Sequence, residues 1–307
     1  MVRRLAAIIL SIAVSALSGV HAESTPEVIR AKAPGGESGK VSANPGDGNA
    51  DSLPDLTKAS LKLHVEEKIT YDIRVNGMPA GKASMEVAKQ ETMDPNGGPE
   101  VWVVQLTIKA NRAVSMFYDV RNKATSKIDV LGGFSRFSHI DKKDGEIRDE
   151  EFVHFDYDLK NMNANYERMR LSDGKLRSHT IALKGNVLDP LSAIYYLRSL
   201  DWSKYKAKDK IELPVCTDRR VWNTRLEVTG RGRDDFGDLK DRPYVTIKAD
   251  PPYKGLFEKK SGMVVSIDAE TGIPLRMNVE IPIGSAEVII SEHRNSPYPG
   301  DDDDKKD

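Results

Sequence analysis

The sequence predicts a mainly β protein. We expect one large, curved antiparallel sheet, shaped like an open barrel or half-barrel or split into two sheets, with one inserted apolar helix. Short segments in which apolar and polar residues alternate recur between residues 61 and 290, which is the period of a strand. Turn dipeptides such as Asn76-Gly77, Asp144-Gly145 and Asp173-Gly174 separate several of these segments. Such dipeptides between strands are typical of antiparallel hairpins.

The first 22 residues have the parts of a secretory signal peptide. Arg3 and Arg4 precede an apolar stretch at 5–17, and Val20-His21-Ala22 is a cleavage site of small-residue type. The apolar stretch is shorter than the roughly 20 residues that a membrane helix needs. We therefore expect a protein that is exported and soluble after cleavage, without a membrane span in the mature form. An uncleaved anchor is the less favoured alternative.

The composition divides the remaining chain into three parts. Residues 23–58 are rich in proline and glycine and have almost no apolar periodicity, which predicts a disordered linker. Residues 59–295 are expected to form a single β-rich domain, and 296–307 a disordered acidic tail. The 46 basic and 47 acidic residues nearly balance, so we expect no nucleic-acid partner. The oligomeric state does not follow from the sequence.

The strand predictions follow the alternation along the chain. They lie at 61–65, 69–75, 83–87, 101–108, 134–140, 147–155, 163–169, 176–183, 210–213, 221–228, 244–249, 263–267, 275–281 and 286–290.

Residues 189–200 predict the helix. Asp189 can cap the first turn, and Pro190 lacks only an amide that would have no helical partner. Leu191, Ile194 and Tyr195 follow at helical spacing, which gives the helix one apolar face. A lone apolar helix among many strands is expected to cover or plug a curved sheet, and such a sheet can hold a ligand.

Several short segments of the sequence, taken together, resemble the bacterial DUF3108 family, an exported domain of unknown function. The resemblance covers roughly residues 69–292 and implies export, but it supplies no catalytic residues. A looser analogy is with periplasmic lipoprotein carriers, in which helices close a curved sheet over a lipid-sized cavity. The segments are 71–77 with 80–83, 189–198, 255–257 followed by 262–265, and 273–276 followed by 281–285.

Five aromatic and aliphatic residues are the candidate ligand-binding residues. Tyr195, Tyr196 and Trp202 lie on or just after the predicted helix. Tyrosine can bury its ring while its hydroxyl remains solvated, which suits the mouth of a cavity. Leu256 and Phe257 follow Gly255 between lysines, as at a loop tip presented to a lipid or a partner. The alternative is that all five are core residues.

No catalytic, metal-binding or cofactor site is predicted. Cys216 precedes two arginines that could activate its thiol, but without a neighbouring base a buried, unreactive cysteine is favoured. If Asp144-Gly145 centres its hairpin, Lys143 pairs with Glu146, and His139 lies opposite Glu150. His154 is then too far along the sheet to share one ion with His139. The acidic pairs, such as Asp149-Glu150-Glu151, are expected to form a solvated face.

Three functions remain after these exclusions. The leading hypothesis is a non-enzymatic periplasmic binding or carrier protein for a lipid or other apolar ligand. The alternative is a structural or protein-interaction module in envelope assembly, which would bind partner proteins through sheet edges. The third is an envelope hydrolase, which requires titratable groups that converge in one cleft.

Overall fold

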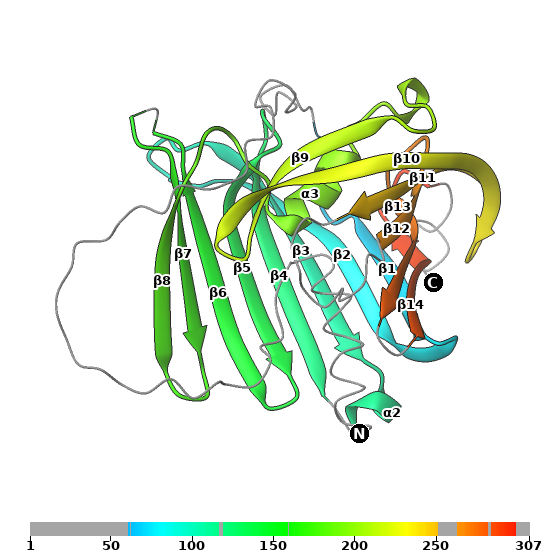
Figure 1. Cartoon of the computed structure of the whole chain (residues 1–307), viewed down its shortest axis with the longest axis horizontal. Helices are drawn as coiled ribbons and strands as arrows, with labels where there is room; N and C mark the ends of the chain where they lie inside the picture. Colours follow the sequence, from blue (N-terminus) through cyan, green and yellow to red (C-terminus); the bar gives the residue numbers. More distant parts are fainter. Residues whose placement is uncertain are drawn as a thin grey trace, which may run out of the picture.

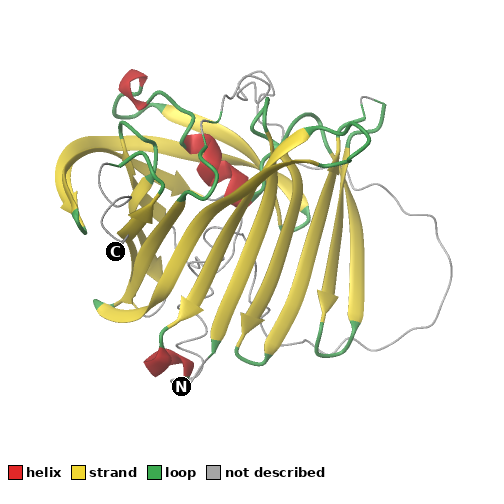
Figure 2. Ribbon diagram, turned by 180° about the vertical axis from the view of Figure 1, so that it is seen from behind, coloured by secondary structure: helices red, strands yellow, loops and turns green. Residues whose placement is uncertain are grey.

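The structure is a computed structural model that describes residues 61, 63–116, 119–158, 160–250, 263–281 and 284–298. The predicted signal peptide, linker and most of the acidic tail lie outside these residues. Within them, the prediction of a mainly β fold with a large, open, curved antiparallel sheet is confirmed (Figures 1 and 2). No helix of the described part is long and apolar enough to cross a bilayer.

Fourteen strands of the described chain form one sheet. They are β1 (Lys68–Val75), β2 (Met78–Thr92), β3 (Glu100–Ala110), β4 (Val120–Asp129), β5 (Ser135–Asp144), β6 (Ile147–Asp156), β7 (Asn163–Arg170), β8 (Lys175–Ala182), β9 (Lys210–Thr217), β10 (Arg220–Phe236), β11 (Leu239–Asp250), β12 (Met263–Asp268), β13 (Pro274–Ile281) and β14 (Gly284–Arg294).

Within the described residues, the strand order shows an open sheet, because its two end strands do not pair with each other. It runs from β8 back to β1, then from β14 back to β9, and every neighbouring pair is antiparallel. The two edge strands, β8 and β9, are therefore consecutive in the chain. The segment that joins them carries helix α3 (Pro190–Leu197).

Two residues of this connection link β5 to β9. Val187 accepts a hydrogen bond from the Ser135 amide, and Leu188 exchanges backbone hydrogen bonds with Pro214 and Cys216 of β9. Strands β6, β7 and β8 extend beyond this link as a wall of their own (Figure 1).

Helix α3 lies on what we call the inner face of the sheet, as the sequence predicts. The Asp189 carboxylate caps it: Oδ1 accepts from the amides of Leu191 and Ser192 at 2.9 and 3.2 Å. Its other oxygen, Oδ2, accepts from the hydroxyls of Ser126 on β4 and Ser135 on β5, at 2.5 and 2.6 Å. One buried carboxylate therefore starts the helix and attaches it to two strands.

The other end of α3 is held by a buried ion pair. The Arg198 guanidinium donates to both carboxylate oxygens of Glu67, at 2.5 and 2.8 Å. A buried pair of this kind is costly to break because the remaining charge would be left without a partner. The helix is thus attached by polar contacts at both ends.

The core lies between α3 and the inner face. Alternate residues of β1 point inward, so Ile69, Tyr71 and Ile73 are buried there. Tyr195 and Trp202 fill the space under the helix and are each 1 % exposed. A second, smaller cluster joins the β6–β8 wall to the β9–β10 hairpin, with Tyr166, Ile181 and Cys216 among its members. The inner face is therefore apolar over β1–β3 and β9–β14.

The sequence did not predict strand β4. Its inner-face positions hold Asn122, Ala124 and Ser126, so apolar alternation is absent from this segment. These positions are polar or small because the strand lies under Asp189, where Ser126 donates its hydrogen bond. The predicted strand at 61–65 is not formed, and the short helix α2 (Arg112–Ser115) and the 3-10 turn η3 (Trp202–Lys204) were not predicted.

The register of the β5–β6 hairpin also differs from the prediction. Asp144 lies opposite Ile147, so His139 faces Phe152 rather than Glu150. The loop consists of Gly145 and Glu146, with Gly145 at a φ of 64°, instead of being centred on Asp144-Gly145.

We predict that Asp189→Ala lowers the free energy of unfolding by about 3 kcal/mol. The change removes a helix cap, worth about 1 kcal/mol, and leaves buried serine hydroxyls without their acceptor, at about 1–3 kcal/mol. Urea unfolding followed by tryptophan fluorescence measures it. Asp201→Ala is the matched control, because Asp201 caps η3 at an exposed site and its loss should lower the stability much less. Equal effects at the two positions would contradict this role of Asp189.

Candidate functional site

Two hollows lie on the inner face along one row of directly opposed residues. The row crosses six strands and becomes polar as it proceeds: Met85, Leu106, Ala124, Ile140, Glu151 and Arg168. Met85 and Leu106 line an apolar hollow, whereas Ile140 and Glu151 line a polar one. Only the β4 position, Ala124, separates the two parts of the row. We call the two hollows together the candidate site.

The apolar hollow lies between α3 and the middle of the sheet. Its enclosed volume is about 30 Å³, and the hollow opens to solvent. The residues that line it are Tyr71, Ala83, Met85, Leu106, Ile194, Pro274, Arg276, Met277 and Val288.

Tyr71 contributes the polar atom of note to this hollow. Its hydroxyl is buried without a hydrogen-bond partner in the described chain, and burial raises its pKa above the ordinary value. A buried hydroxyl without a partner is unfavourable, so a ligand oxygen here would be stabilising.

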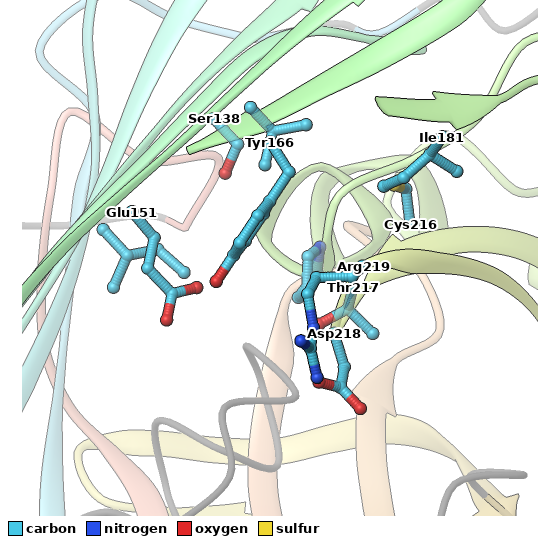
Figure 3. A pocket seen from close by; sticks show the side chains of 11 residues that line it. Ser138, Glu151, Tyr166, Ile181, Cys216, Thr217, Asp218 and Arg219 are labelled. Carbon is cyan, nitrogen blue, oxygen red and sulfur yellow. The ribbon is translucent and has the colours of Figure 1, made fainter. Parts of the chain in front are cut away.

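The polar hollow lies where the β9–β10 hairpin meets the β6–β8 wall. Figure 3 shows Glu151 and Tyr166 on one side, and Cys216, Thr217, Asp218 and Arg219 across from them. Ser138 and Ile140 of β5 also line it. Its enclosed volume is about 20 Å³, and it also opens to solvent.

The Glu151 carboxyl has a perturbed proton affinity. Burial raises its pKa, although Arg168, Lys142 and a hydrogen bond from Tyr166 oppose the shift. Burial likewise raises the pKa of the Tyr166 phenol. The hollow therefore holds a carboxyl that takes up a proton more readily than a solvated one.

The charged groups beside the hollow are largely paired with one another. Arg168 donates to Asp149 at 2.6 Å and lies 3.5 Å from Glu151, while Lys142 lies 3.7 Å from Asp144. Asp149 is itself buried and held by Arg168, and does not line the hollow. Hydrolysis by two carboxyl groups requires both to face the bond that breaks. Glu151 and Asp218 are the two carboxyl groups that line the hollow, from opposite sides (Figure 3).

The structure places Tyr195, Tyr196 and Trp202 in the core. None of them lines either hollow, and Trp202 donates its indole N–H to the Leu197 carbonyl. Their neighbour Ile194 is the α3 residue that does line the apolar hollow. Leu256 and Phe257 lie outside the described residues. Among the described residues, no three His, Cys, Asp or Glu side chains are grouped so that they could hold a metal ion.

Sequence reasoning missed the residues that build the candidate site. Glu151 was expected on a solvated face, but it points into the polar hollow and is partly buried. Leu106, Ile140 and Arg168 carry no motif. The register would have identified them, because alternate residues of β5, β6 and β7 share the inner face.

The Glu151→Gln variant tests the raised pKa of this carboxyl. Because the folded-state pKa lies above the unfolded-state value, protonation of Glu151 stabilises the fold at low pH, and this contribution is lost as the pH rises through the folded-state pKa. Glutamine stays neutral throughout. The stability of the variant relative to the wild type should therefore rise between about pH 4 and pH 7, measured by urea unfolding across that range. A difference that falls with pH would contradict the raised pKa.

Cys216 should be unreactive in the folded protein, as the sequence suggests. It is buried, and burial raises the pKa of its thiol to about 12. At about pH 8 only roughly one molecule in ten thousand then carries the thiolate. Alkylation by iodoacetamide, followed by mass spectrometry, should be orders of magnitude slower than in the urea-unfolded chain. Equally fast labelling in both states would show an accessible thiolate.

Comparisons with known proteins place the chain in a family. The search of curated proteins gave no match. Among solved structures, it is similar to a β-barrel-like protein of the domain of unknown function DUF1849 from Brucella abortus, with 14% identity and a TM-score of 0.48, over 75% of this chain and 97% of that one. It is also similar to MucB, with 11% identity and a TM-score of 0.27, over 80% of this chain and 58% of that one. Both scores are below 0.5, so neither likeness carries an argument about function. The model of the DUF3108 family, described as a protein of unknown function, matches residues 70–291, and the chain therefore belongs to the DUF3108 family.

Proposed function

We propose that this chain is a non-enzymatic binding or carrier protein of the bacterial envelope, which holds a lipid or another amphiphile on the inner face of its sheet. The observation that carries the proposal is the apolar hollow beside α3. It lies between the helix and the curved sheet, although Tyr195, Tyr196 and Trp202 do not line it.

The lining of the hollow suits an alkyl chain. Met85, Leu106, Met277 and Val288 offer aliphatic and thioether surface, and Ile194 of α3 covers it. Burying a methylene group contributes about 0.8 kcal/mol, so a chain of several carbons would gain appreciable affinity here. The flexible methionine side chains can adapt to chains of different shape.

Export supports the same proposal. The signal peptide predicted at 1–22 would deliver the protein to the periplasm, where amphiphiles that cross the aqueous space need a protein to cover their apolar part. In this proposal Tyr195, Tyr196 and Trp202 act by seating the helix that carries Ile194. Leu256 and Phe257 are proposed as apolar residues that meet the ligand.

Ala83→Leu should weaken binding of a neutral amphiphile at least tenfold. Ala83 is buried on the inner face of β2 and lines the hollow, so the larger side chain would occupy the space for the ligand. Isothermal titration calorimetry with 1-monolauroylglycerol, below its micelle concentration, measures the change.

The matched control is Ser84→Leu, which adds similar bulk to the opposite face of the same strand. It should bind as the wild type does. Native mass spectrometry of the protein purified from the periplasm should also reveal a bound lipid. If no lipid is found and wild-type protein does not bind monolauroylglycerol, the proposed function is wrong.

A protein-interaction module is the second candidate, and edge strand β8 is the observation that favours it. Six consecutive residues of this strand, Lys175–Thr180, are exposed. An extended peptide could pair with such an edge, but its charged side chains also discourage pairing. Crosslinking from Ser178→Cys in cells would recover a specific protein if this candidate is right, and only nonspecific products otherwise.

A further inference from the structure

We infer that the polar hollow binds an anionic head group, a carboxylate or phosphate, and that Arg219 is the residue that contacts it. This inference rests on the proposed function, because it assigns the polar end of the same ligand. The apolar chain would lie over Leu106 and Ala124, and the head group would reach Glu151 and the β9–β10 turn.

The first observation is the backbone of this turn. Asp218 and Arg219 form the two-residue loop between Thr217 and Arg220, which lie directly opposite each other. Both loop residues have positive φ values, 48° for Asp218 and 62° for Arg219. Turns of this kind favour Asn-Gly or Asp-Gly, because an L residue with a long side chain is strained there. Asp218 fits that preference, whereas Arg219 stands where glycine would be favoured.

The second observation is where the strained residue places its side chain. Arg219 lines the polar hollow, on the side opposite Glu151 and Tyr166 (Figure 3). Its side chain is 57% exposed, and its partner among the described residues is Asp218, at 3.9 Å. This separation is longer than a hydrogen bond, so the guanidinium keeps donors for a ligand. A residue kept in a strained conformation at a hollow is a candidate for function.

Arg219 differs in this respect from the other basic residues nearby. Lys142 and Arg168 are much less exposed, at 5% and 19% of their side chains, and are paired with Asp144 and Asp149. The first pair lies within β5 and the second joins β7 to β6, whereas Arg219 lines the hollow. A guanidinium binds carboxylate and phosphate oxygens through two parallel hydrogen bonds.

The charge of the surrounding surface also favours an anion. By register, the inner face of β5–β8 and the turn together present six basic and four acidic side chains. The basic ones are Lys142, Arg168, Arg170, Lys175, Arg177 and Arg219; the acidic ones are Asp144, Asp149, Glu151 and Asp218. Ser138 and Tyr166 add hydroxyl groups to the lining of the hollow. The lining of the hollow itself holds two carboxyl groups, those of Glu151 and Asp218, and one guanidinium, that of Arg219. The excess of basic side chains lies beyond the lining, on β7 and β8, where Arg170 and Lys175 also pair with Asp173.

The distance between the hollows suits an amphiphile. Leu106 and Glu151 belong to the same cross-strand row and are three strands apart. At about 4.8 Å per strand, the separation is about 14 Å along the sheet, comparable with a chain of about a dozen carbons. The separation of the two hollows therefore matches the length of one such molecule.

The test compares Arg219→Gly with the wild type, using the full chain after signal removal, laurate as the anionic probe and 1-monolauroylglycerol as the neutral one. Calorimetry should show laurate binding weakened at least tenfold, and monolauroylglycerol binding changed less than twofold. The melting temperature of the free variant should be unchanged or higher, because glycine relieves the strain of the turn. A loss of laurate affinity can then not be attributed to unfolding.

Lys208→Gly is the matched control. Lys208 is also an exposed basic residue with a positive φ, 78°, but it does not line the hollow. The control changes the same charge and relieves the same kind of strain, and should leave laurate binding unchanged. Arg219→Lys should give an intermediate affinity, because lysine keeps the charge without the paired donors.

The outcomes separate the two proposals. If both probes bind and Arg219→Gly weakens neither, or weakens both equally, the head-group assignment is wrong and the proposed function stands. If neither probe binds the wild type, the proposed function fails first. Inorganic phosphate alone should bind at least tenfold more weakly than laurate; equal binding would show a site for a free anion and overturn the amphiphile assignment.

Discussion

The position of one buried carboxylate, Asp189, decides the architecture. It caps α3 with one oxygen and accepts hydrogen bonds from serines of β4 and β5 with the other. The connection that it anchors lies between β5 and β9, which Val187 and Leu188 link by backbone hydrogen bonds. Strands β6–β8 continue beyond this link as a separate wall.

This arrangement gives the inner face two chemical halves. Beneath and beside α3 the strands are apolar, because the helix buries them. Beyond β4 the same face carries paired charges, with Glu151 and Tyr166 at a hollow. An amphiphile matches this division, since its apolar chain and polar head need opposite surroundings. The transition falls at β4, whose inner residues are small or polar.

The same strand shows why the prediction from sequence was incomplete. Strands with regular apolar alternation, such as β1 and β3, were predicted, because each buries one face against the core. Strand β4 was missed, since Asn122 accepts from a backbone amide of the neighbouring strand β5 and Ser126 donates to Asp189, so both inner positions are polar. The polar Ser126 at an inner position of β4 is explained by its hydrogen bond to Asp189, which lies 63 residues further along the chain.

The sequence by itself determined the strand-rich fold, the helix with its Asp189-Pro190 start, and the family resemblance. These depend on local periodicity, helix capping and short contiguous sequence segments. Only the tertiary structure decided which side chains meet across the sheet. Glu151 is brought into line with Ile140 and Leu106 by strand register, which a shift of one residue would reverse. Tyr195 and Ile194 are adjacent on one apolar helix, yet one fills the core and the other lines a hollow. That difference depends on which strands lie beneath the helix, and so on contacts between residues far apart in the chain.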